Sequence, residues 1–167
     1  MGLWGASGPG APPGRRLEFS LSHTRGLVVC AVALGNQVGV DVESRQRQRT
    51  LSPLLLARRY FAPAESAVLA RLPPEEQLGA FLAFWTLKEG FVKACGSGLA
   101  RPLGDFAFSL FADRPPMISF APALPDRPED WQFAQPRLAP DYQVGLAVRR
   151  PAASPAIIVL RGEGTLP

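Results

Sequence analysis

The chain has 167 residues, 47% of them hydrophobic, and its 18 lysines and arginines against 14 aspartates and glutamates give a net charge of +4. This length fits one domain or two small subdomains, and the apolar content is enough for a core. No apolar run approaches the ~20 residues that cross a bilayer, and residues 1–14 lack the basic start and apolar block of a secretory signal. These features exclude a membrane-spanning protein and predict a cytoplasmic one.

The positive charge comes almost entirely from arginine, since the chain has 16 arginines and only two lysines. A basic surface can meet nucleic acid, a membrane or an acidic protein. The arginines are scattered, without the interleaved aromatic residues of a nucleic-acid site, so we expect neither a nucleic-acid nor a membrane partner. Cys30 and Cys95 lie far apart and outside any metal-binding pattern, which predicts two buried free thiols.

Three strands are predicted near the start of the chain. Residues 1–16 are rich in glycine and proline and should be irregular. Residues 17–22 alternate apolar and polar side chains, as a strand does. Residues 27–34 form a nearly continuous apolar run, typical of a strand buried on both faces. A Gly-Asn turn separates that run from residues 37–43, so we expect these last two strands to pair as an antiparallel hairpin.

Three helices are predicted next. Ser52 followed by a proline indicates a helix start, and this helix should run to about Phe61. A second short helix is expected near 64–71. A longer helix opens at 73–76, where two glutamates suit the positive helix terminus, and ends at the Gly-Ser-Gly of 96–98.

The rest of the chain is predicted to be strands. Strand patterns separated by Pro and Asp turns occupy 106–110, 117–120, 131–137 and 142–149. Residues 151–167 are predicted to be a loosely attached tail. Strands grouped around a set of helices predict an α+β fold, whose domain we place at 17–150.

Asp41 and Glu43 are the first candidates for chemistry. Positions two apart in a strand share a face, so the two carboxylates project together while Val40 and Val42 take the opposite face. Neighbouring carboxylates repel each other unless a cation lies between them, and Mg²⁺ suits one or two carboxylates with phosphate oxygens. The alternative is a solvated strand edge with two incidental acids.

The predicted long helix carries Lys88, Glu89 and Lys93. Glu89 and Lys93 are four residues apart and therefore lie on one face of the helix. The alternative is an ordinary surface ion pair. However, these are the only two lysines of the chain, and lysine offers phosphate a compact charge that arginine does not replace.

Ser22 and His23 follow the first strand pattern, and His23 is the only histidine. A single histidine is more often structural than catalytic. Neither a nucleophile-elbow serine nor a Gly-rich phosphate loop is present, which argues against a hydrolase triad or a Walker-type site.

These candidates form an ordered series that resembles the phosphopantetheinyl transferases of the surfactin-synthetase-activating type. The family pattern is F-N-x-S-H, then G-[IV]-D-[IV]-E, then W-[ST]-x-K-E-[SAG]-x-x-K. The corresponding residues here are Phe19-Ser20-Leu21-Ser22-His23, Gly39-Val40-Asp41-Val42-Glu43 and Trp85-Thr86-Leu87-Lys88-Glu89-Gly90-Phe91-Val92-Lys93. The resemblance covers most of the chain.

The resemblance implies a fold, a reaction and a set of residue roles. The implied fold is an antiparallel sheet packed against a long helix and shorter helices. The implied reaction moves the phosphopantetheine arm of coenzyme A onto a serine of an apo acyl or peptidyl carrier protein and releases 3′,5′-ADP. The implied magnesium ligands are Asp41, Glu43 and Glu89. The groups implied to contact coenzyme A are Ser22, His23, Lys88 and Lys93.

The resemblance also makes Glu89 the candidate general base, with Lys93 as the other catalytic residue. A carboxylate cannot be both a tight metal ligand and a free base, so both roles of Glu89 stay open.

The chain departs from the family in one large respect. The family has an N-terminal half before the F-N-x-S-H strand, whereas about 16 residues precede it here. A homodimer in which one copy stands in for that half is therefore expected to be possible. A second reading is a half-enzyme that binds carrier protein or coenzyme A without transfer. A metal-dependent nuclease is a third reading, but its Glu and Lys are two apart on a strand, unlike Glu89 and Lys93.

Overall fold

The computed structural model describes residues 16–46, 51–96 and 101–150. Its strands and helices follow the chain in the order β1 (Leu17–Thr24), β2 (Leu27–Leu34), β3 (Val38–Ser44), α1 (Pro53–Tyr60), α2 (Pro63–Ala70), α3 (Pro74–Cys95), η2 (Leu103–Asp105), β4 (Phe106–Ser109), β5 (Met117–Phe120), η3 (Pro128–Asp130), β6 (Trp131–Ala134) and β7 (Tyr142–Arg149). Residues 1–15 of the expected irregular segment 1–16, and all of the expected tail at 151–167, lie outside the described residues. Within the described ranges, none of the helices is both long and apolar enough to span a membrane.

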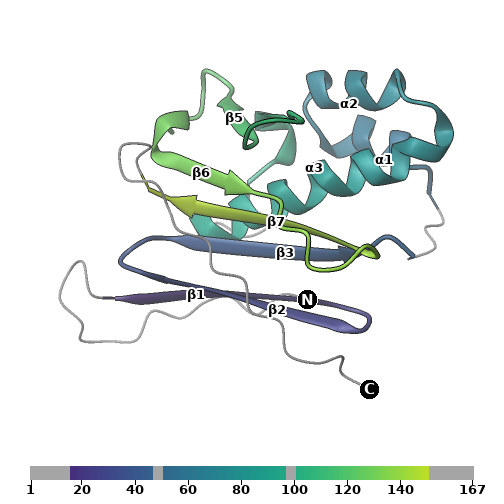
Figure 1. Cartoon of the computed structure of the whole chain (residues 1–167). Helices are drawn as coiled ribbons and strands as arrows, with labels where there is room; N and C mark the ends of the chain where they lie inside the picture. The colour runs from purple at the N-terminus through teal and green to yellow at the C-terminus, as the bar shows by residue number, and fades with distance from the viewer. Residues whose placement is uncertain (1–15, 47–50, 97–100, 151–167) are drawn as a thin grey trace.

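The main sheet has the strand order β3-β7-β6, and every pairing in it is antiparallel. Helix α3 packs across β3 and β7, with α1 and α2 beside it, and the hairpin β1–β2 lies on the side of β3 away from β7 (Figure 1). The strands β4 and β5 form a separate small hairpin. This mixture of a long helix, shorter helices and antiparallel sheet confirms the predicted α+β class.

The predicted pairing of 27–34 with 37–43 is wrong. Strand β2 pairs with β1 across a turn at Gly26, whose φ of 81° is one that glycine readily adopts. Strand β3 pairs instead with β7, with Asp41 opposite Gly145. The outer edge of β3 meets side chains, since the N–H groups of Val40 and Val42 donate to the Oγ atoms of two β1 serines at 3.1 and 3.3 Å. The connection from β1 to β2 and the connection from β2 to β3 both contain residues typical of turns. The local sequence therefore did not show which neighbour β2 pairs with.

The principal core lies between α3 and the sheet. Phe91 is fully buried in it, and its ring lies 4.7–4.8 Å, centroid to centroid, from those of Trp131 and Phe106. A smaller cluster of buried valines fills the space between the hairpin and the sheet, and it consists of Val29, Val40, Val42 and Val144. The prediction that Val40 and Val42 point away from Asp41 into a core is therefore confirmed.

Three glycines bring α3 unusually close to the sheet. A Cβ built on Gly39 of β3 would lie 1.9 Å from the carbonyl oxygen of Gly90 in α3. A Cβ on Gly145 of β7 would lie 2.3 Å from the carbonyl carbon of Thr86. Real Cβ atoms do not approach so closely, so helix and strands are in backbone contact at these points.

Strand β2 is less buried than its sequence predicts. Only Val29 is buried, while Val28, Val32 and Leu34 are exposed. Cys30 is also exposed and Cys95 is half-buried, so the prediction of two buried thiols is wrong. The reason is that the hairpin has one face against β3 and β7 and the other toward solvent.

Candidate functional site

Asp41 is the centre of a polar cluster between β3 and α3. It lies in β3 on the face that α3 covers, and only 7% of the residue is exposed. Its Oδ1 atom accepts hydrogen bonds from the Ser22 hydroxyl at 2.8 Å and from the Lys93 ammonium at 2.7 Å. The hairpin and the helix thus each supply one donor to a carboxylate that belongs to β3.

The second oxygen of Asp41, Oδ2, has no hydrogen-bond partner although it is buried. Leaving a buried charged acceptor unsatisfied costs on the order of 1–3 kcal/mol or more. Such an atom is the expected place for a ligand that supplies positive charge.

Lys93 lies in the last turn of α3, and Gly96 ends the helix in the left-handed conformation just beyond it. Its Nζ atom donates to the carbonyl oxygen of Val40 at 3.2 Å as well as to Asp41. A helix C-terminus favours a cation, so the position suits lysine. The lysine side chain is 17% exposed, so part of it reaches solvent.

Glu89 lies one helical turn before Lys93 on α3 and is half-buried. Burial raises its pKa, and the negative charges of Asp41 and Glu43 raise it further, while Lys93 opposes the shift. Burial also raises the pKa of Asp41, against the effects of Lys93 and Ser22. The three predicted metal ligands therefore share one electrostatic neighbourhood with an excess of negative charge.

The chemistry of this donor set fits a hard divalent cation, although the arrangement is open. No group of three or more His, Cys, Asp or Glu side chains in the described ranges is placed to hold a metal ion. Mg²⁺ commonly uses one or two carboxylates and takes its remaining ligands from water and substrate phosphates. The unsatisfied Oδ2 of Asp41 can supply one such carboxylate ligand.

Ser22 and His23 are not brought together. Successive side chains of a strand point to opposite faces, and Ser22 is buried against Asp41 while His23 is exposed on the other face of β1. Ser22 joins the cluster, and the contact of His23 with coenzyme A stays a prediction.

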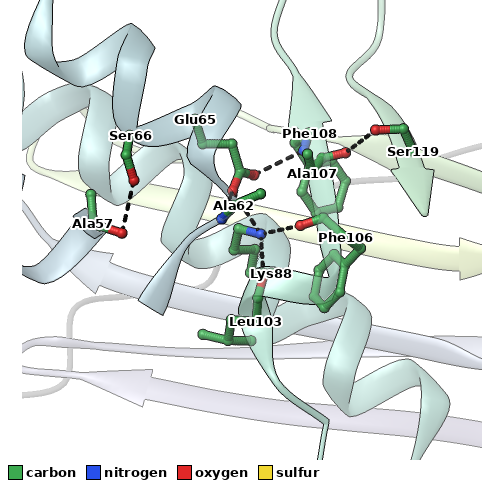
Figure 2. A network of polar contacts seen from close by, with 10 residues as sticks. All are labelled: Ala57, Ala62, Glu65, Ser66, Lys88, Leu103, Phe106, Ala107, Phe108 and Ser119. Atoms are coloured by element: carbon green, nitrogen blue, oxygen red, sulfur yellow. Dashed lines mark hydrogen bonds and ion pairs between the residues drawn. The ribbon is translucent and has the colours of Figure 1, made fainter. Parts of the chain in front are cut away.

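Lys88 does not fit the coenzyme contact predicted for it. Its Nζ atom is completely buried and donates to the carbonyl oxygens of Leu103 at 2.7 Å and Phe106 at 2.6 Å (Figure 2). It also pairs with Glu65 Oε2 at 2.8 Å, so all three ammonium donors have partners inside the protein. A phosphate would have to break this network to reach it.

Glu65 is the residue that sequence reasoning missed. Besides pairing with Lys88, it accepts hydrogen bonds from the backbone N–H groups of Ala62 at 3.0 Å and Phe108 at 2.8 Å (Figure 2). Burial raises the pKa of Glu65 and lowers that of Lys88, and their ion pair opposes both shifts. Its one local signal was a glutamate at the third position of a helix that begins with proline.

Comparison with known proteins links these residues to characterised sequences. The model of the 4'-phosphopantetheinyl transferase superfamily matches residues 37–147. The 4'-phosphopantetheinyl transferase HetI of Nostoc sp. strain PCC 7120 is 37% identical over 64% of this chain and 44% of its own length. Psf-1 of Bacillus pumilus is 31% identical over 98% of this chain and 68% of its own, and Sfp of Bacillus subtilis is 29% identical over 80% and 56%.

Among solved structures, holo-[acyl-carrier-protein] synthase of Thermotoga maritima superimposes with a TM-score of 0.52 at 20% identity, over 69% of this chain and 63% of that one. This likeness supports the fold alone. The chain spans about half the length of most of these curated relatives, 44% of HetI and 56% of Sfp, and 68% of psf-1.

Proposed function

This chain belongs to the 4'-phosphopantetheinyl transferase superfamily, and from that premise we propose that it transfers the phosphopantetheine arm of coenzyme A to a serine of an acyl or peptidyl carrier protein. The observation that supports the proposal is the cluster in which Asp41 keeps one buried oxygen unsatisfied beside Lys93 and Glu89. Such a cluster suits a substrate that brings phosphate groups together with a cation.

In the proposed site, Asp41 and Glu89 would hold Mg²⁺, with Glu43 contributing charge from the next outward position of β3. When bound, Mg²⁺ would neutralise the diphosphate of coenzyme A and polarise the phosphorus under attack. Lys93 would then share its ammonium between Asp41 and a phosphate oxygen. Ser22 would keep Asp41 in its rotamer through the hydrogen bond at 2.8 Å.

The proposed reaction is a phosphoryl-type transfer. The carrier serine oxygen bonds to the β-phosphorus of coenzyme A, the bond from that phosphorus to the bridging oxygen breaks, and 3′,5′-ADP leaves. Glu89 would accept the serine proton, directly or through a water molecule. In that role it is not also a ligand of Mg²⁺, which Asp41 and Glu43 would then hold. Its raised pKa makes it a stronger base than an ordinary glutamate, which suits this role. Positioning and charge neutralisation provide most of the catalysis in such reactions.

The direct test incubates the full chain with an apo carrier domain, coenzyme A and Mg²⁺ and weighs the carrier by mass spectrometry. We expect the carrier to gain the mass of phosphopantetheine, and Asp41→Ala to abolish the gain while the fold is kept. Glu129→Ala, at an exposed position, is the control and should transfer normally. No mass gain at high enzyme concentration would reject the reaction, and full turnover by both Asp41→Ala and Glu89→Ala would reject the site.

A second candidate function is a binding module that holds coenzyme A or a carrier protein without transfer. The observation that favours it is the cluster itself, since Lys93 and the unsatisfied Oδ2 of Asp41 can bind a phosphate and a cation whether or not transfer follows. Titration calorimetry distinguishes the two. A module would bind coenzyme A with Mg²⁺, and lose binding in Lys93→Met, while producing no modified carrier.

A further inference from the structure

The hairpin β1–β2 has an outward face made of apolar side chains. The strand register places four cross-strand pairs on it, and these are Leu17 with Leu34, Phe19 with Val32, Leu21 with Cys30, and His23 with Val28. The opposite face carries Ser20, Ser22 and Val29, which are buried toward β3. The hairpin therefore has one covered face and one open face.

The open face is the largest gathering of exposed apolar side chains in the described part of the chain. Leu17 and Leu34 are each 60% exposed, Val32 is 58%, Val28 is 53% and Phe19 is 36%. The other exposed large apolar residues there are distributed over several separate elements. A strand with one face in solvent normally alternates apolar and polar residues, whereas β2 is apolar at all eight positions. The composition of β2 thus suits a strand covered on both sides.

The open face carries no Asp, Glu, Lys or Arg, although the chain as a whole has a net charge of +4. Two positively charged copies can meet here without placing like charges together. The five side chains are 36–60% exposed and would form the apolar centre of such a contact, for which a specific interface buries about 1,000 Å² or more in total. Patches of this size on a soluble protein commonly mark contact sites.

We infer that this face is the contact between two copies of the chain, which meet across a twofold axis near the centre of the hairpin. A twofold contact uses the same patch on both copies, so an uncharged apolar face is complementary to itself. The inference does not rest on the proposed transfer reaction. Its link to the site is through β1, whose covered face presents Ser22 to Asp41, so that a bound second copy would hold the same strand from outside.

The test measures the mass of the full chain by analytical ultracentrifugation over a range of concentrations. We expect the wild type to form dimers. Val32→Lys, which puts a charge into the centre of the face, should weaken association at least tenfold. Met117→Lys is the matched control, because Met117 is a strand residue 53% exposed on a different hairpin, and it should associate as the wild type does. Circular dichroism checks that both variants are folded.

Cys30 provides a second readout, since it lies on the open face. Its reaction with a thiol reagent should slow as the wild-type concentration rises, and should not slow in Val32→Lys. Cys95 interferes little, because burial raises its pKa to about 11. A wild type that stays monomeric with Cys30 equally reactive at every concentration overturns the inference and assigns the face to another occupant. Association that Val32→Lys does not weaken overturns it as well.

Discussion

The two lysines of the chain lie five residues apart on α3, and each pairs with a carboxylate, but the two pairs differ in how far they are satisfied. Lys88 and Glu65 are both 0% exposed at their side chains, and every donor of the lysine has a partner. Lys93 and Asp41 are 17% and 10% exposed, and one carboxylate oxygen of Asp41 has no partner. The same two charged groups, an ammonium and a carboxylate, thus form a closed pair and an open pair along one helix.

The difference in burial indicates a structural role for the first pair and a role in ligand binding for the second. The closed pair ties α2, α3 and β4 together and has no capacity left for a ligand. The open pair has an unused acceptor, a lysine side chain that is partly exposed and a neighbouring acid whose pKa is raised. Changes to the first pair should therefore alter stability, and changes to the second should alter binding and turnover.

The largest effect is expected from Lys88→Met. Removal of one partner of a buried ion pair leaves the other charge uncompensated, so the free energy of unfolding should fall by about 3–5 kcal/mol in a urea titration. Arg127→Met is the control, because its pair with Glu129 is largely exposed and its loss should change stability little. An unfolding curve like that of the wild type would show that Lys88 does not hold these elements together.

The next effect concerns the open pair. Glu89→Gln keeps the shape of the side chain but removes the proposed base, so the rate of carrier modification should fall by about 10²–10⁴-fold. The measurement is the initial rate by mass spectrometry at saturating coenzyme A. Glu75→Gln, in the exposed first turn of the same helix, should retain the wild-type rate. Equal rates for both variants would remove Glu89 from the chemistry.

Mg²⁺ should stabilise the open pair in the absence of substrate. A ligand that binds only the folded state at 100 times its dissociation constant adds about 2.7 kcal/mol, so the melting temperature should rise by several degrees. Asp41→Asn should remove most of this rise, whereas Asp113→Asn should keep it. A rise that is equal in all three proteins would mean that the ion binds elsewhere.

The smallest effect is the pH dependence of stability. Because the pKa of Glu89 is higher in the folded than in the unfolded protein, its contribution is fully present below the unfolded pKa and is lost as pH rises through the folded one. Without Mg²⁺, the free energy of unfolding should therefore fall over that window, by about 1 kcal/mol or less because the group is partly solvated. Glu89→Gln should flatten the curve there, and an unchanged slope would contradict the raised pKa.

The elements were predictable because their signals are local. Ser52 and the following proline mark the start of α1, and Gly96 marks the end of α3, where the sequence indicated them. The partner of β3 was not predictable, because its pairing with β7 joins residues about a hundred positions apart in the sequence. No local pattern distinguishes that pairing from a hairpin with β2.

The geometry of the candidate site was only partly predictable. The alternation of β3 put Asp41 on the face opposite Val40, and helical spacing put Glu89 beside Lys93. The structural role of Lys88 was not predictable. It depends on an ion pair with Glu65 in α2, and no spacing pattern in the sequence links that residue to α3. Burial is a property of the packed molecule, and it decides which lysine faces solvent.

The contact between Gly39 and Gly90 makes the site sensitive at positions that carry no functional group. A methyl at residue 39 would act as a wedge between strand and helix, since it would enter the space of a carbonyl oxygen 1.9 Å away. The added methyl would push β3 and α3 apart and so increase the distance between Asp41 and Lys93, although no charged residue is changed. The distance between the charged side chains of this cluster thus depends on the two glycines as much as on the charged residues themselves.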